Sequence, residues 1–228
     1  MSARRLSRLF PSLLSLLALL AWAVPAWALD PATTGLVVLH GKWGKPEGVA
    51  PLSAALEDAG FLVEAPQMGW GGPRPFLAPY ETALTAIDAA ADRLRSRGAT
   101  RIVVAGHSLG GNAALAYAAG GGSVAALVLV APAHLPESAF VKDGCADSLD
   151  KARAMAAAGH GDEAGWFKSL NSGNRDRMVE TSARAYLSYY DSSSAAAMTL
   201  TAPRLPAGQP VLWVAPGRDP TTRSFADL

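Results

Sequence analysis

The chain has 228 residues, of which 50% are hydrophobic and 17% are charged, and 20 Lys and Arg residues balance 19 Asp and Glu residues. This length and apolar content exclude a disordered or fibrous chain and suit one α/β domain or two small ones. A formal net charge of +1 gives no electrostatic basis for binding nucleic acid. The single cysteine, Cys145, excludes an internal disulfide, and no cluster of Cys and His has the spacing of a zinc site.

Residues 1–28 have the pattern of a secretory signal peptide. A basic start is followed by an apolar stretch at residues 9–24 and by the A-x-A sequence of residues 26–28. We therefore expect cleavage before Leu29, a mature domain of residues 29–228, and a periplasmic or secreted protein without stable membrane insertion. An uncleaved anchor is the alternative, because the apolar stretch is nearly long enough to span a bilayer. Prolines and serines that interrupt the stretch favour cleavage.

Five short and almost wholly apolar stretches predict β-strands, at residues 35–40, 61–63, 101–105, 124–130 and 210–214. Continuous apolarity is typical of strands that are buried on both faces of a parallel sheet. Helical patterns lie between them, at residues 49–59, 80–97 and 109–119. Alternating strands and helices predict a doubly wound, mostly parallel α/β sheet with right-handed crossovers.

Residues 134–205 follow a different pattern. They contain helical stretches at residues 150–158 and 175–190 and no strong strand. A helical, cap-like insertion on one rim of the sheet is the simplest explanation. Because no long linker and no internal repeat are found, we expect the mature chain to be one domain that carries this insertion.

The predicted strand at residues 101–105 runs directly into G-H-S-L-G at residues 106–110, a G-x-S-x-G motif between a strand and a helix. Such a turn forces Ser108 into a strained conformation and leaves room only for small neighbours. It also lifts the hydroxyl above the sheet, over a helix N-terminus that favours negative charge. The alternative is an ordinary glycine-rich turn with an N-cap serine, which the flanking strand and helix disfavour.

This motif resembles the nucleophile elbow of the α/β-hydrolase superfamily, and the resemblance extends over residues 35–219. It implies the α/β-hydrolase fold and a serine hydrolase that cleaves a small-molecule carboxylic ester or thioester with Ser108 as nucleophile. It implies no metal and no organic cofactor. Residues 40–44, H-G-K-W-G, resemble the H-G-x-x-G loop of the superfamily, so the backbone amides of Lys42 and Leu109 would hold the oxyanion. A plain glycine turn is the alternative for this loop. For the Lys42 side chain, contact with an anionic group is one interpretation, and solvation, which is usual for an isolated charge, is the expected one.

Asp219 follows the last predicted strand, where the superfamily carries the carboxylate of its catalytic triad. An Asp before Pro is also a frequent turn former. Only nine residues (228 − 219) follow Asp219 and none is a histidine, although the triad runs Ser, acid, His along the chain. A crossover needs at least about ten residues. We therefore expect an incomplete C-terminus that lacks the last strand, the last helix and the catalytic histidine. The competing hypothesis is a non-catalytic remnant or binding protein with the hydrolase scaffold.

Among the histidines present, His134 is the candidate for a substitute base, because it follows the predicted strand at residues 124–130 on the same rim as Ser108. The alternative is a histidine that only lines the rim. Trp43 and Trp70 lie in loops after the first two strands and are expected to line an apolar pocket, with packing inside the core as the alternative. The sequence does not determine the ester or the oligomeric state.

Overall fold

The structure of the protein is a computed structural model that describes residues 29–171 and 176–215. The predicted signal peptide and Asp219 lie outside these residues. The elements below belong to one compact unit that begins at Pro31. Within the described ranges, no helix combines the length and the apolar character that crossing a lipid bilayer requires.

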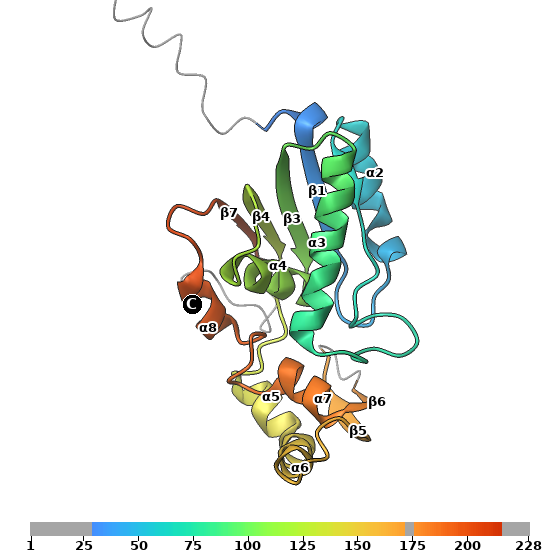
Figure 1. Cartoon of the computed structure of the whole chain (residues 1–228), viewed down its shortest axis with the longest axis vertical. Coiled ribbons are helices and arrows are strands. Elements are labelled where there is room, and N and C mark those ends of the chain that lie inside the picture. Colours follow the sequence, from blue (N-terminus) through green and yellow to red (C-terminus); the bar gives the residue numbers. More distant parts are fainter. Residues whose placement is uncertain (1–28, 172–175, 216–228) are drawn as a thin grey trace, which may run out of the picture. The chain divides into compact units, whose positions relative to one another are not determined.

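A five-stranded parallel sheet forms the centre of this unit (Figure 1). Its strands, in spatial order, are β2 (Leu62–Glu64), β1 (Thr34–Leu39), β3 (Arg101–His107), β4 (Ala126–Val130) and β7 (Val211–Val214). All four pairings are parallel. β1 is buried along its whole length, as its continuous apolar run predicted. The five strands expected from the sequence are therefore confirmed.

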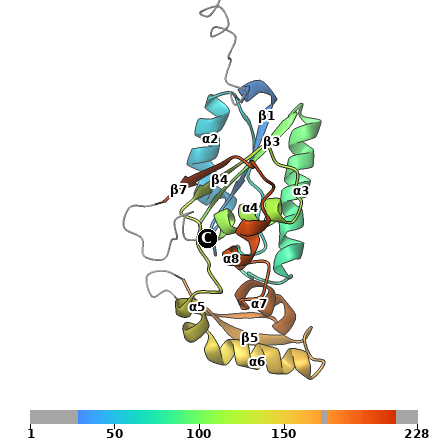
Figure 2. The same ribbon diagram turned by 90° about the vertical axis from the view of Figure 1, so that its left-hand side faces the viewer.

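Helices cover both faces of the sheet, and Figure 2 shows α2 on one side and α3 and α4 on the other. Their bounds are α2 (Ala50–Asp58), α3 (Tyr80–Ser96) and α4 (Leu109–Ala119), and three short 3-10 helices are η1 (Pro31–Thr33), η2 (Pro46–Val49) and η3 (Ala202–Arg204). α3 packs an apolar stripe, which includes Ile87 and Leu94, into the core. The chain turns back after α3 at Gly98, whose φ of 102° suits a glycine.

The order of the strands reverses between β1 and β3. From β1 the chain moves outward to β2 and then crosses back over β1 to reach β3. In open α/β sheets, ligands bind outside the carboxyl ends of the strands at this switch point. The loop that follows β1 and the turn that follows β3 therefore mark the edge of the sheet where a site is expected.

Most of the chain between β4 and β7 forms a cap, which the figures place at the carboxyl end of the sheet. The cap contains α5 (Ala139–Gly144), α6 (Ala146–Ala157), β5 (Ala164–Ser169), β6 (Arg177–Ser182) and α7 (Ala183–Tyr190), whereas α8 (Met198–Thr201) and η3 pack against α4. β5 and β6 pair antiparallel as a separate two-stranded sheet, here named the cap hairpin.

The expectation of a helical insertion with no strong strand is wrong, since β5 and β6 form a hairpin, and the helix expected at residues 175–190 exists only from Ala183 onward. In β6, Val179 and Thr181 are buried while Met178 and Glu180 are exposed. This alternation has the period of two that a half-buried strand requires, and a search for continuous apolar runs does not detect it.

Candidate active site

Ser108 lies at the turn between β3 and α4, with a φ of 55° and a ψ of −121°. Residues other than glycine rarely adopt this conformation, and it persists only where the surroundings hold it. The Ser108 amide donates to the carbonyl of Val130 (3.0 Å), and its carbonyl accepts bonds from the amides of Gly111 (2.9 Å) and Asn112 (3.1 Å). The side chain is partly exposed and does not cap the helix, so its hydroxyl is available to a substrate.

The two glycines of the motif allow the strand and the helix to touch. A Cβ atom on Gly106 would lie 2.2 Å from the carbonyl carbon and oxygen of Gly110. A Cβ atom on Gly110 would lie 2.5 Å from the carbonyl oxygen of Leu39 and 2.8 Å from that of His40. Side chains do not approach backbone atoms so closely, so α4 can begin here only with glycine at both positions. This close approach of strand and helix explains why the G-x-S-x-G motif predicts a tight turn.

The loop of residues 40–44 packs against this turn. A Cβ atom on Gly41 would lie 3.2 Å from the Cβ atom of Ser108. The His40 ring is buried, with its Nδ1 donating to the Gly41 carbonyl (2.9 Å) and its Nε2 accepting from the Met68 amide (3.1 Å). Burial lowers the pKa of His40, which keeps the ring neutral. His40 therefore orders the loop.

The backbone amides of Lys42 and Leu109 have no hydrogen-bond acceptor among the described residues, whereas the amide of Trp43 donates to the Trp70 carbonyl (2.9 Å). Leu109 is also the first residue of α4, where the helix dipole favours a negative charge. The arrangement can therefore offer backbone donors to an oxygen atom near Ser108.

His134 lies on the same rim, but its ring contacts the cap. Its Nε2 donates to the Tyr189 carbonyl (2.8 Å), and the ring packs edge-on against Tyr190 with 4.8 Å between centroids. Burial first, and then the nearby charge of Lys42, hold the pKa of His134 well below its ordinary value. The Nδ1 atom is buried and has no partner among the described residues, so the neutral ring keeps one basic nitrogen unpaired.

Trp70 and Trp43 have different surroundings. The Trp70 side chain is fully buried, donates from its indole nitrogen to the His40 carbonyl (2.9 Å) and stacks on Tyr80. It therefore belongs to the core and presents no open surface to a substrate. Trp43 is partly buried, and the guanidinium of Arg177 lies 4.4 Å from the centre of its ring.

The Lys42 side chain is directed into the protein, so the expectation that it is solvated is wrong. Its Nζ donates to the Leu170 carbonyl (2.5 Å) and to the Tyr190 hydroxyl (3.4 Å). Burial lowers the pKa of Lys42 to about 7, although the Cys145 thiol and the Asp176 carboxylate oppose the shift. Sequence reasoning had no signal for these contacts, because Leu170 lies 128 residues further along the chain.

Asn112 is a second residue whose role the sequence analysis missed. Its side-chain nitrogen donates to the carbonyls of His134 (2.9 Å) and Ala196 (2.8 Å), and its oxygen accepts a bond from the Tyr80 hydroxyl (2.5 Å). It lies one helical turn after Ser108, so it ties both ends of the cap to the helix beneath the elbow. The signal that could have revealed this role is a single Asn side chain in a helix that otherwise consists of small and apolar residues and one tyrosine.

The pKa of Lys42 leads to a testable dependence of stability on pH. An unfolded lysine stays protonated up to about pH 10.5, whereas the folded one loses its proton above about 7. Unfolding between these values takes up a proton, so a rise in pH stabilises the fold. We expect the free energy of unfolding of wild type, relative to Lys42→Met, to rise by up to about 1.4 kcal/mol per pH unit from pH 7 to 10. Urea titrations of both proteins measure this difference, and a constant difference would contradict the shift.

Within the described ranges, no group of three or more His, Cys, Asp or Glu residues is arranged to hold a metal ion. Ser108, the amides of Lys42 and Leu109 and the N-terminus of α4 lie at the same edge of the sheet.

Comparison with solved structures shows the same fold in several enzymes. A structure described under LipS and LipT, two metagenome-derived lipolytic enzymes, matches with a TM-score of 0.57 and 19% identity over 85% of this chain and 76% of that one. A monoacylglycerol lipase from Paleococcus ferrophilus matches with a TM-score of 0.55 and 20% identity over 85% and 77%. The complex of DcsB with its substrate analogue matches with a TM-score of 0.59 and 17% identity over 86% and 76%.

No match to the sequence was found among curated proteins. A family model described as the alpha/beta hydrolase family matches residues 36–228, which include most of β1, the other four strands of the parallel sheet and the turn at Ser108. The chain therefore belongs to the alpha/beta hydrolase family.

Proposed function

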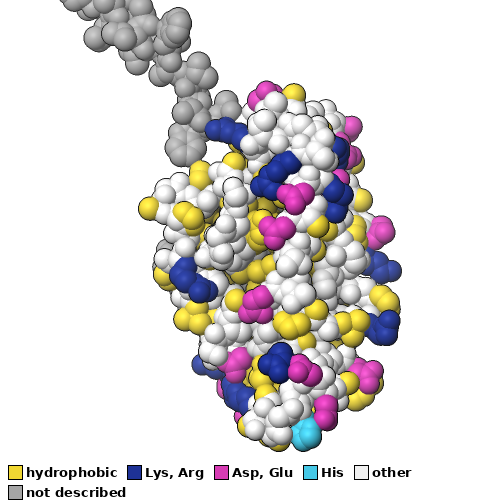
Figure 3. Space-filling view, in the orientation of Figure 1, with side chains coloured by type: hydrophobic (Ala, Val, Ile, Leu, Met, Phe, Trp, Pro, Cys, Tyr) yellow, Lys and Arg dark blue, Asp and Glu magenta, His cyan; other side chains and the backbone are white. Residues whose placement is uncertain are grey.

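We propose that the protein is an exported serine hydrolase that cleaves a small-molecule carboxylic ester or thioester by acyl transfer. The observation that carries this proposal is the strained backbone of Ser108, which presents a partly exposed hydroxyl at the switch point of the sheet. The lipolytic enzymes with the same fold support an ester as the substrate class. Basic and acidic side chains are interspersed on the face shown in Figure 3, which also favours a small molecule over nucleic acid.

In this mechanism the Ser108 hydroxyl attacks the carbonyl carbon of the substrate. The oxygen of the tetrahedral intermediate accepts bonds from the amides of Leu109 and Lys42, each worth about 3 kcal/mol in the transition state. The alcohol or thiol leaves with a proton, and water then hydrolyses the acyl-enzyme to release the acid and regenerate the hydroxyl. No metal and no organic cofactor takes part in the proposed reaction.

The reaction requires a base, because a serine hydroxyl is a weak nucleophile at neutral pH. We assign Asp219 as the carboxylate that orients a catalytic histidine. Among the histidines of the chain, His134 is the candidate base, through the unpaired Nδ1 of its neutral ring. A selective loss of kcat in His134→Gln would support that role, whereas retained activity would remove it.

A non-catalytic protein that keeps the hydrolase scaffold is the second candidate function. One observation favours it: none of the four histidines of the chain, all of which the structure describes, forms a hydrogen bond with the Ser108 hydroxyl. In this case the site would bind an ester or a related molecule without cleaving it.

A fluorophosphonate probe distinguishes the two candidates. We expect the probe to label wild type at Ser108 and to leave Ser108→Ala unlabelled, with the modified peptide identified by mass spectrometry. Ser96→Ala is the matched control, because the Ser96 hydroxyl is exposed and bonds only to the Arg93 carbonyl. Labelling that persists in Ser108→Ala would exclude Ser108 as nucleophile, and an unlabelled, folded wild type would favour the non-catalytic candidate.

Export rests on residues 1–28 and has its own test. The N-terminal sequence of the protein recovered from the periplasm or the medium is expected to begin at Leu29. A protein that retains Met1 in the membrane fraction would favour the uncleaved anchor.

A further inference from the structure

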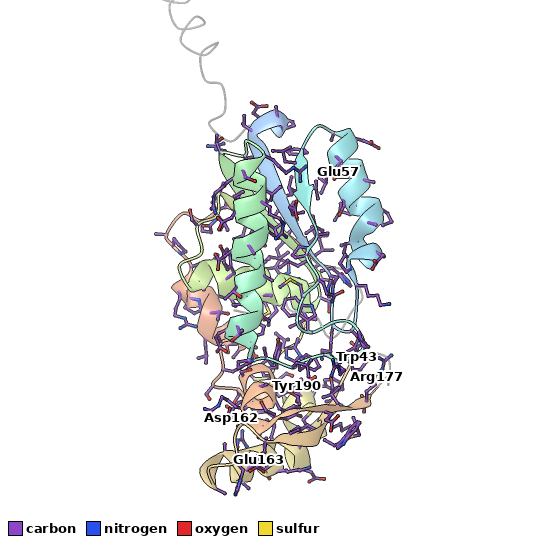
Figure 4. The ribbon with its side chains drawn as sticks, turned by 45° about the vertical axis from the view of Figure 1, so that its right-hand side comes forward. Trp43, Glu57, Asp162, Glu163, Arg177 and Tyr190 are labelled. Carbon is purple, nitrogen blue, oxygen red and sulfur yellow. The ribbon has the colours of Figure 1, made fainter. Side chains whose placement is uncertain are left out.

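Two neighbouring side chains of the 40–44 loop extend to the cap hairpin. The Lys42 ammonium donates to the carbonyl of Leu170, which directly follows β5. The Trp43 ring lies against the guanidinium of Arg177, the first residue of β6 (Figure 4). The loop next to Ser108 is therefore attached to the ends of both strands of the hairpin.

The Lys42 side chain contacts a tyrosine, Tyr190, that is itself held by its neighbours. Its Nζ also lies 5.3 Å from the centre of the Tyr190 ring, and Tyr190 is fully buried. The Tyr190 hydroxyl is bonded to the Ser169 hydroxyl (2.5 Å), and its ring stacks on Tyr186 with 4.6 Å between centroids. The Leu170 carbonyl, the Tyr190 hydroxyl and the Tyr190 ring therefore surround the Lys42 Nζ, and the Asp176 carboxylate favours its charged form.

The attachment of Trp43 supports a strained backbone. The φ of Trp43 is 57°, a left-handed conformation that costs a bulky residue about 1–2 kcal/mol. Its amide donates to the Trp70 carbonyl, and Arg177 covers its ring. Because Trp43 follows Lys42 directly, a change in its φ would also rotate the peptide units next to the Lys42 amide.

We propose that the Lys42 side chain and Arg177 are positioning residues that hold the 40–44 loop against the cap hairpin, so that the Lys42 amide faces the oxyanion. The proposal rests on the proposed function, because it assigns that amide to the oxyanion site. A preorganised donor acts on the transition state only while its direction is fixed. The cap hairpin would therefore control the rate of the chemical step.

The first experiment measures the loop without using activity. Hydrogen exchange of the Trp43 and Gly44 amides is followed by NMR in wild type, Lys42→Met and Arg177→Gln, since both amides are hydrogen-bonded. We expect about tenfold faster exchange in each variant, because local opening becomes easier when an attachment is lost. Arg184→Gln is the matched control. Arg184 lies at the start of α7 and pairs with Asp162, so its substitution is expected to leave the exchange of the loop amides unchanged.

The second experiment measures hydrolysis of a short-chain nitrophenyl ester. We expect kcat to fall about tenfold or more in Lys42→Met and Arg177→Gln, while KM stays within about twofold of the wild-type value. This pattern is typical of a variant that stabilises the transition state less and binds the substrate equally well. The free energy of unfolding of Lys42→Met is measured in parallel, because the Leu170 carbonyl and the Tyr190 hydroxyl lose a donor in this variant, and kcat is compared under conditions in which both proteins stay folded. Arg177→Lys keeps a cation at Trp43 and is expected to recover part of kcat.

The outcomes separate this proposal from the proposed function. Unchanged amide exchange in both Lys42→Met and Arg177→Gln overturns the proposal, whether or not the protein hydrolyses esters. Faster exchange with an unchanged kcat overturns the positioning role. A wild type without Ser108-dependent hydrolysis contradicts the proposed function instead, and the exchange experiment then decides whether the two side chains hold the loop.

Discussion

Gly106→Val is expected to prevent stable folding of the protein. A Cβ atom at this position would lie 2.2 Å from two backbone atoms of Gly110 and 2.6 Å from the amide nitrogen of Gly111. Backbone atoms in the first turn of a helix cannot rotate away, so α4 would have to move off β3. That movement would break the bonds that hold Ser108 and would open the core around a helix that is buried almost all round. We expect a loss of at least about 4 kcal/mol in the free energy of unfolding.

The matched control is Gly48→Val, because a Cβ atom on Gly48 meets no atom within 4 Å. This variant is expected to express and unfold like wild type. Urea unfolding followed by circular dichroism measures both proteins, with soluble yield as the readout for any variant that does not fold. A folded Gly106→Val whose stability lies within about 1 kcal/mol of wild type would show that the close approach of strand and helix is not required.

Asn112→Ala is expected to cost about 3 kcal/mol or more in the free energy of unfolding. The substitution leaves the carbonyls of His134 and Ala196 and the hydroxyl of Tyr80 without their partner in a buried region. Each buried polar group that loses its partner costs about 1–3 kcal/mol, and the empty volume adds to the loss. Because His134 and Ala196 flank most of the cap, we also expect the cap to become sensitive to proteolysis before the sheet unfolds.

Tyr80→Phe provides the comparison for this prediction. It removes only one of the three hydrogen bonds of Asn112 and leaves both bonds to the cap in place, so the expected cost is about 1–2 kcal/mol. Thermal unfolding of both variants and limited proteolysis with cleavage sites identified by mass spectrometry measure the two effects. If Asn112→Ala cost no more than Tyr80→Phe, the two bonds to the cap would contribute nothing to stability.

Sequence patterns predicted the parts of the fold that depend on local chemistry. The apolar runs of β1 and β3 specify strands buried on both faces, and the glycines at 106 and 110 specify a helix that touches a strand. The signal for the cap hairpin was also local, but it had a period of two, with Val179 and Thr181 buried and Met178 and Glu180 exposed. The helix predicted at residues 175–190 therefore includes β6, because a helical pattern does not separate this strand from α7.

The α/β architecture and the position of Ser108 at its turn can be predicted from the sequence, because both follow from side-chain size and polarity over a few neighbouring residues. The burial of Trp70, the anchoring of the Lys42 side chain in the cap and the bonds from Asn112 that tie the cap to α4 depend instead on how the chain packs in three dimensions. These contacts join residues far apart in the chain, such as Lys42 and Leu170, and they depend on the approach of whole elements. No spacing along the sequence records such an approach, since it exists only after the sheet, the helices and the cap have packed together.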